Sequence, residues 1–101
     1  MPWIQVTAPP PEVGNPSRTG VEVAAWAARC AEQVASILRL DPHDVIVLVH
    51  LAEAASSAGA VVTVTGRRRD DSEEVALSEL LITAVGRWAQ IPADRVALVR
   101  N

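Results

Sequence analysis

The chain contains an internal repeat, and this repeat limits the folds open to it. Pro42-His43-Asp44 is followed, after one residue, by the apolar run 46–49. Pro92-Ala93-Asp94 is followed, again after one residue, by the apolar run 96–99. The two aspartates are 50 positions apart (94 − 44). Two copies of one supersecondary unit are therefore expected within a single domain of residues 1–101, with repeat one at 1–50 and repeat two at 60–101.

Each repeat reads as strand, helix, strand. Ile4-Gln5-Val6-Thr7 and Val62-Thr63-Val64-Thr65 alternate apolar and polar residues, which is the period of a half-buried strand. Thr19 with Glu22 fits a capping box that begins the first helix, and Asp41-Pro42 is expected to end it. The apolar stripes of the two helices are Val23, Trp26, Ala27, Cys30, Val34, Ile37 and Leu38, then Leu77, Leu80, Leu81, Ala84, Trp88 and Ile91.

Two tandem β-α-β units predict an α/β (α+β) domain with a four-stranded mixed sheet. Right-handed crossovers place both helices on one face of that sheet. The unbroken apolar runs 45–49 and 96–99 favour strands covered on both faces. Because the helices cover only one face, a second chain is expected to cover the other, and the protein is expected to be an oligomer.

Composition excludes several classes of function. The net charge of −3 and a pI near 5.2 argue against binding to nucleic acid or to an anionic membrane surface. The lone Cys30 cannot form an internal disulfide, and no apolar run approaches the ~20 residues of a membrane helix. All nine cationic residues are arginine, which is typical of GC-rich bacterial genomes. A soluble, cytoplasmic, bacterial protein is the expectation.

Met1-Pro2 stands directly before the first strand. Methionine is usually removed when the next residue is as small as proline, which leaves Pro2 with a free secondary amine. An α-amino group has a pKa near ~8, and burial beside cationic side chains lowers it toward neutrality. Pro2 could therefore act as a base or nucleophile, although a proline that simply begins a strand fits the dipeptide equally well.

Three consecutive arginines, Arg67-Arg68-Arg69, follow the third predicted strand. Arginines two apart on an extended segment point the same way, so Arg67 and Arg69 could together bind a carboxylate. They would also disfavour protonation of a neighbouring amine. A solvated turn paired with Asp70 and Asp71 is the alternative. His43 and His50 have no cluster of other ligands in the sequence around them, so no metal site is predicted.

The start Met1-Pro2, the two β-α-β units and the segment 63–69 together resemble the tautomerase superfamily. The resemblance is best over residues 60–99, where Thr63-Val64-Thr65-Gly66-Arg67-Arg68-Arg69 and Ile91-Pro92-Ala93-Asp94-Arg95-Val96 carry it. The branches it looks most like are malonate semialdehyde decarboxylase and cis-3-chloroacrylic acid dehalogenase, with macrophage migration inhibitory factor more distant. The resemblance implies a homotrimer and cofactor-independent catalysis.

The resemblance also implies roles for individual residues. Pro2 matches the catalytic proline, Arg67 and Arg69 the substrate-binding arginines, and Asp44 the water-activating aspartate. Asp44 could equally serve turn structure, as its repeat mate Asp94 would. Trp3, beside Pro2, either forms a wall of the substrate pocket or simply packs. No tyrosine is present, so the phenol that assists water attack in the dehalogenases has no counterpart.

Three functions remain open at this point. The first is a tautomerase in which Pro2 is the general base on a small keto or enol carboxylate. The second is a decarboxylase or hydratase with protonated Pro2 and a water placed by Asp44. The third is a non-catalytic member of the same fold, or a ferredoxin-like interaction module, although the stretch between Val49 and Ala60 is long for the tight hairpin of a ferredoxin-like fold.

Overall fold

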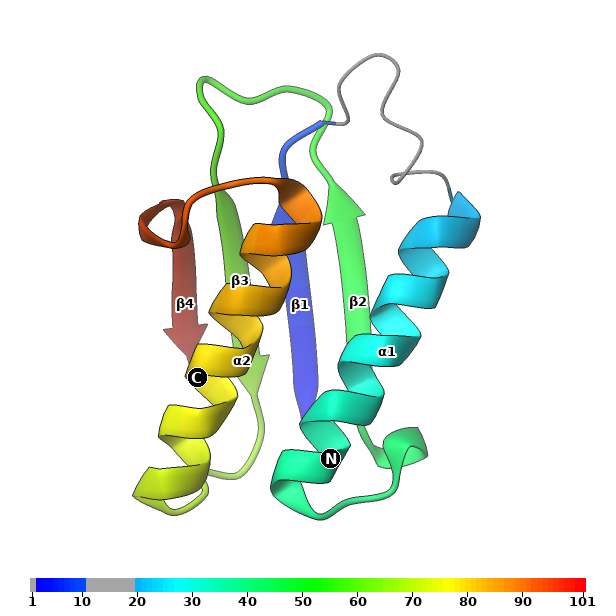
Figure 1. The fold of residues 1–101 in the computed structure, drawn as a ribbon, viewed down its shortest axis with the longest axis vertical. Helices are drawn as coiled ribbons and strands as arrows, with labels where there is room; N and C mark the ends of the chain where they lie inside the picture. Colours follow the sequence, from blue (N-terminus) through cyan, green and yellow to red (C-terminus); the bar gives the residue numbers. More distant parts are fainter. Residues whose placement is uncertain (1, 11–19) are drawn as a thin grey trace.

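The computed structural model describes residues 2–10 and 20–101. Their elements follow the predicted order of strand, helix, strand, twice over (Figure 1). The strands are β1 (Trp3–Ala8), β2 (Ile46–Leu51), β3 (Ala60–Thr65) and β4 (Val96–Arg100), and the helices are α1 (Gly20–Leu38) and α2 (Asp71–Ala89). The short 3-10 helices η2 (Pro42–Asp44) and η3 (Ala93–Arg95) precede β2 and β4 at matching points of the two repeats.

The four strands form one mixed sheet in the order β2-β1-β3-β4. Within each repeat the strands are parallel, so β1 pairs with β2 and β3 pairs with β4. The two repeats join through β1 and β3, which run antiparallel with Ile4 opposite Val64 and Val6 opposite Val62. The first strand of each repeat is therefore central, and the second lies at an edge. The four-stranded mixed sheet predicted from the repeat is confirmed.

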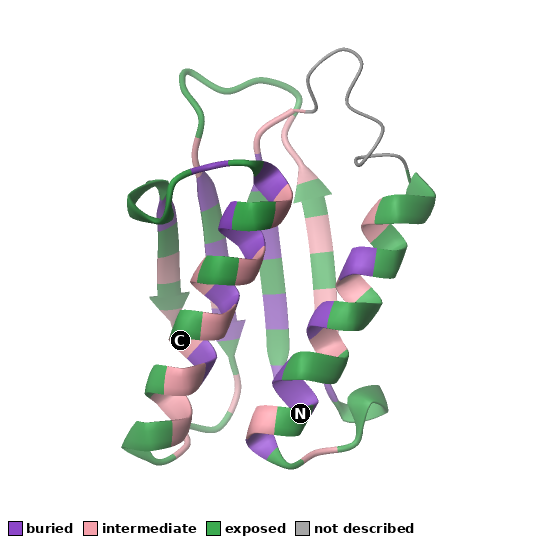
Figure 2. Ribbon diagram, in the orientation of Figure 1, coloured by how far each residue is buried: buried purple, intermediate pink, exposed green. Residues whose placement is uncertain are grey.

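Both helices cover the same face of the sheet, as right-handed crossovers require (Figures 1 and 2). Alternate residues of β1 and β3 point toward the helices and are buried, while those between them are mostly exposed. The largest fully buried side chains come from both strands and both helices. They are Ile4, Leu81, Val6, Val34, Val62, Val64, Val85 and Cys30.

Both helices end earlier than the sequence predicts. Helix α2 ends at Ala89, before Ile91 and Pro92, because Gln90 adopts a left-handed conformation with φ of 58°. Helix α1 ends at Leu38, before Asp41-Pro42, because Arg39 adopts a left-handed conformation with φ of 56°. The Leu40 N–H then donates to the Ala35 carbonyl at 2.9 Å, which closes the last turn. The capping box expected at Thr19 lies outside the described residues. No helix in the described part of the chain is long and apolar enough to cross a membrane.

The sheet face opposite the helices, which we call the open face, is covered by no helix or strand among residues 2–10 and 20–101. The apolar run 45–49 was expected to be covered on both faces, but β2 is an edge strand, and Leu48 on the open face is 46% exposed. Trp3, Val61 and Val99 on neighbouring strands are 44%, 44% and 45% exposed on the same face.

Candidate active site at the start of strand β1

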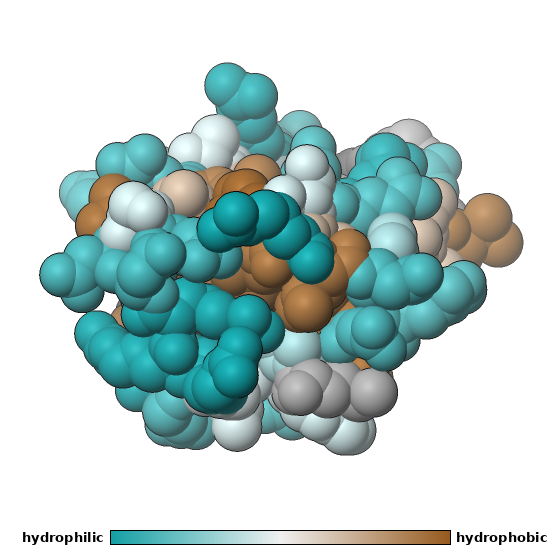
Figure 3. Space-filling view, turned by 90° about the horizontal axis from the view of Figure 1, so that it is seen from below, coloured by the Kyte–Doolittle hydropathy of each residue, from teal (hydrophilic) through white to brown (hydrophobic). Residues whose placement is uncertain are grey.

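Pro2 lies at the end of the sheet where β1 begins, and it is buried. The Ile46 N–H of β2 donates to the Pro2 carbonyl at 3.1 Å, so the parallel ladder extends to Pro2 and fixes its backbone. The end of α1, the end of β3 and the start of α2 lie at the same end of the molecule (Figure 1). Figure 3 looks onto this end and shows an apolar centre surrounded by hydrophilic side chains.

A cavity of about 200 Å³ opens at this end, lined by Pro2, Leu40, Asp44 and Arg69. Four separate segments contribute to it: the start of β1, the turn after α1, η2, and the loop before α2. Three of the residues singled out in the sequence, Pro2, Asp44 and Arg69, thus line one cavity. Leu40 supplies an apolar wall that sequence reasoning missed, because its position depends on the left-handed turn at Arg39.

Asp44 is positioned by a small hydrogen-bonded turn. The Asp41 side chain caps η2 by accepting from the His43 N–H at 2.9 Å, and the Asp41 carbonyl accepts from the Asp44 N–H at 2.9 Å. The Asp44 carboxylate itself takes no part in these capping bonds. The carboxylate that caps this turn therefore belongs to Asp41, and Asp44 lines the cavity.

The three arginines have different surroundings. Arg69 is half-buried and lines the cavity, whereas Arg67 and Arg68 are exposed and do not. Gly66 opens the segment with φ of 145°, a conformation that favours glycine. Asp70 ends it by capping α2, since its carboxylate accepts from the Glu73 N–H at 2.8 Å. This hydrogen bond lowers the pKa of Asp70.

An ion pair between Arg100 of β4 and Glu74 of α2 braces this segment, and sequence reasoning missed both residues. The guanidinium lies 3.1 Å from the Glu74 carboxylate, and the two side chains are only 14% and 12% exposed. Arg100 also donates to the carbonyls of Gly66 at 3.1 Å and Arg67 at 3.0 Å. Glu74 in turn accepts from the Arg69 N–H at 3.1 Å. The arginine loop is therefore held from both sides by one partly buried ion pair.

The remaining residues singled out in the sequence lie elsewhere. Trp3 is on the open face and does not line the cavity. Cys30 lies on the buried side of α1, and burial raises the pKa of its thiol to about 11, so it is neutral at pH 7. Among the described residues, no group of three or more His, Cys, Asp or Glu is placed to hold a metal ion.

The fold is shared with solved structures, although neither a protein-family model nor a curated protein matches the sequence. A macrophage migration inhibitory factor homologue from Prochlorococcus marinus has a TM-score of 0.78 at 18% identity, covering 98% of this chain and 86% of that chain. Malonate semialdehyde decarboxylase has a TM-score of 0.66 at 21% identity, and the match covers 98% of this chain and 84% of that chain. A fused 4-OT that is a symmetric trimer has a TM-score of 0.76 at 15% identity, and the match covers 98% of this chain and 83% of that chain.

These similarities extend over almost the whole of this chain and most of each related chain. They match the order of elements, the mixed sheet and the two helices on one face described above. The chain therefore shares its fold with these proteins, and this is the fold that the resemblance to the tautomerase superfamily implied.

Proposed function

We propose that the protein is a tautomerase-type enzyme that uses the free amine of Pro2 as a general base on a small keto or enol carboxylate. The observation that carries this proposal is the cavity of about 200 Å³ shared by Pro2, Asp44 and Arg69. A base and a carboxylate-binding cation beside one small cavity are what a proton transfer on an α-keto acid needs. Enzymes with the same fold, such as malonate semialdehyde decarboxylase, support a catalytic role.

In this proposal Met1 is removed, and the amine of Pro2 is held at the sheet end by the hydrogen bond from Ile46 to its carbonyl. Burial of Pro2 and the positive charge of Arg69 both disfavour the protonated amine, so the pKa of the amine falls from its ordinary value near ~8. The neutral amine takes the enol hydroxyl proton. The resulting ammonium then delivers a proton to the neighbouring carbon, which gives the ketone and restores the amine.

Arg69 is the proposed partner of the substrate carboxylate, and Arg67, two positions earlier on the same loop, is a proposed second arm. Asp44 favours a second candidate reaction, because its carboxylate lines the same cavity as Pro2. In a decarboxylase or hydratase, protonated Pro2 polarises the substrate and Asp44 places a water molecule. Release of CO₂ from a 3-oxo acid would identify that reaction.

The test is the enol–keto interconversion of phenylenolpyruvate, followed by absorbance, with three forms of the protein whose intact masses are measured. We expect processed protein to be active and Pro2→Ala to be strongly impaired, because a primary amine on a flexible residue is less well placed. A form that keeps Met1 should be inactive, because its Pro2 nitrogen is an amide. Equal activity of the Met1-retained form would exclude the amine as catalyst. Inactivity of every form on any such acid would favour a non-catalytic role.

A further inference from the structure

A second cavity lies between the two helices and is separate from the Pro2 site. It is a groove of about 400 Å³, within the range of small-molecule sites. From α1 it is lined by Trp26, Arg29, Cys30 and Gln33, and from α2 by Leu80, Thr83, Ala84, Arg87 and Trp88. It shares no lining residue with the Pro2 cavity. Because it lies on the helix side of the sheet, a partner chain on the open face would leave it accessible.

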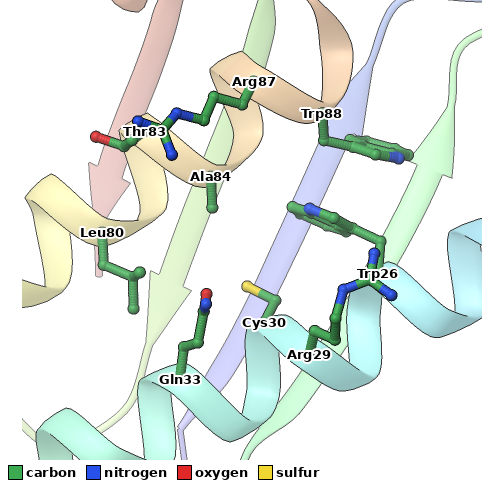
Figure 4. A pocket seen from close by; sticks show the side chains of 9 residues that line it. All are labelled: Trp26, Arg29, Cys30, Gln33, Leu80, Thr83, Ala84, Arg87 and Trp88. Carbon is green, nitrogen blue, oxygen red and sulfur yellow. The ribbon is translucent and has the colours of Figure 1, made fainter.

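One part of the groove is apolar and flat. The rings of Trp26 and Trp88 stack with centroids 4.4 Å apart and planes within 15°, which joins the two helices at this point (Figure 4). Leu80 and Ala84 point from α2 toward α1 and continue the apolar wall (Figure 4). Cys30 adds a neutral sulfur, since burial raises its pKa to about 11. An aromatic or aliphatic ring could pack against these side chains.

The other part of the groove is cationic. Arg29 on α1 and Arg87 on α2 are both exposed, and within the described residues neither forms an ion pair. None of the described residues that line the groove carries a carboxylate, and Gln33 and Thr83 supply neutral hydrogen-bonding groups. Two guanidinium groups without a lining carboxylate stand out on a chain whose net charge is −3. The groove is therefore electrostatically complementary to an anion.

We propose that this groove binds a small, flat, apolar molecule that carries a carboxylate or a similar anionic group. The apolar part packs against the tryptophan pair and the aliphatic wall, and the anionic group is bound by Arg29, Arg87 or both. Both features are needed, because a purely apolar ligand leaves the guanidinium groups without a partner, and a small inorganic anion buries no apolar surface.

The test uses 2-naphthoate and the three indole N–H signals of ¹⁵N-labelled protein, since the chain contains only three tryptophans. We expect saturable shifts of the Trp26 and Trp88 signals, while that of Trp3 on the open face stays still. Shifts of all three signals would indicate nonspecific apolar binding and would overturn the proposal. So would the absence of saturable shifts, or equal affinity for uncharged 2-naphthamide.

Single-residue variants identify which arginine contacts the anionic group of the ligand. Arg29→Gln and Arg87→Gln should each raise the Kd for 2-naphthoate about two- to fivefold, the effect of one exposed ion pair. Arg68→Gln removes the same charge from an exposed arginine outside the groove and should leave the Kd unchanged. Arg69→Ala reports on the Pro2 cavity and should also leave it unchanged. An equal rise in Kd for Arg68→Gln would mean that the ligand responds only to the overall positive charge of the protein surface. A large rise in Kd for Arg69→Ala would place the ligand in the Pro2 cavity.

Discussion

Arg68 and Arg69 are adjacent in sequence, yet only one of them borders the cavity at Pro2. Arg69 is half-buried with its backbone N–H bound to Glu74, whereas Arg68 is exposed. A half-buried guanidinium beside a partly enclosed cavity is less screened by water when it binds a carboxylate. Their environments, and not their chemistry, distinguish the two.

Replacing Arg69 with Ala should therefore weaken binding of a small keto acid by about 1.5–3 kcal/mol, the range for hydrogen bonds to charged groups. Arg67→Ala should have a smaller effect, because that side chain is exposed. Arg68→Ala is the matched control and should leave binding unchanged. Calorimetric titration with a slowly reacting keto acid would measure all three. Equal losses of binding free energy in all three variants would mean that the keto acid responds only to the general positive charge of the loop, and not to a specific contact with Arg69.

The first turn of α2 carries two neighbouring glutamates that connect to other elements in different ways. Glu74 binds Arg100 of β4 in a pair whose side chains are 12% and 14% exposed. Glu73 lies 3.7 Å from Arg39 beyond the end of α1, and that arginine side chain is 81% exposed. The Arg100 hydrogen bond, aided by the Arg69 N–H, lowers the pKa of Glu74 from its ordinary value of 4.5.

Glu74→Gln should therefore destabilise the protein by about 1.5–3 kcal/mol at pH 7, because it leaves Arg100 without its charged partner. A lowered pKa in the folded state contributes stability above the ordinary value of 4.5, and this is lost as pH falls through the lowered pKa. The difference between Glu74→Gln and wild type should shrink accordingly in acid. Urea unfolding at pH 7 and below pH 4.5, at one protein concentration, measures both effects.

Glu73→Gln is the matched control in the same helical turn. Because its partner is largely exposed, we expect a loss below about 1 kcal/mol. If the two variants were equally stable at pH 7, the Arg100–Glu74 pair would not be the brace of the arginine loop.

At the scale of the whole molecule, the described residues form two layers, with both helices over one face of the sheet (Figure 2), and no described helix or strand covers the other face. Trp3, Leu48, Val61 and Val99 on this open face are each between 44% and 46% exposed. We expect three chains to associate through their open faces, and a fused 4-OT of the same fold is a symmetric trimer. Light scattering at micromolar concentration should give three times 10.7 kDa.

Leu48→Asp should convert the trimer to smaller species, because it places a charge at one of the exposed apolar residues of the open face. Val75→Asp introduces the same charge at a valine of α2 that is 56% exposed, and it should leave the trimer intact. A wild-type protein that stays monomeric, or equal effects of the two variants, would contradict association through the open face.

The sequence by itself determined the order of elements, the two-repeat plan and the side of the sheet that each residue of the alternating strands β1 and β3 faces. These features depend on local periodicity and on breakers such as Pro92, and handed crossovers then leave few arrangements. It also singled out Pro2, Asp44 and Arg69, although no spacing in the chain relates them. Their common cavity depends on where three loops return to the start of β1.

Only the tertiary structure decided which arginine borders that cavity and what holds it. The alternation of an extended strand predicts that Arg67 and Arg69 share a side, but Gly66 and the Asp70 cap bend the segment away from strand geometry. From the sequence, Arg100 is only a residue at the end of a predicted strand. It holds the arginine loop because the parallel pairing of β3 and β4 places it opposite Val64 and near Glu74. Leu40 likewise reaches Pro2 only because Arg39 turns left-handed. Such contacts join residues far apart in the chain, so local sequence patterns do not predict them.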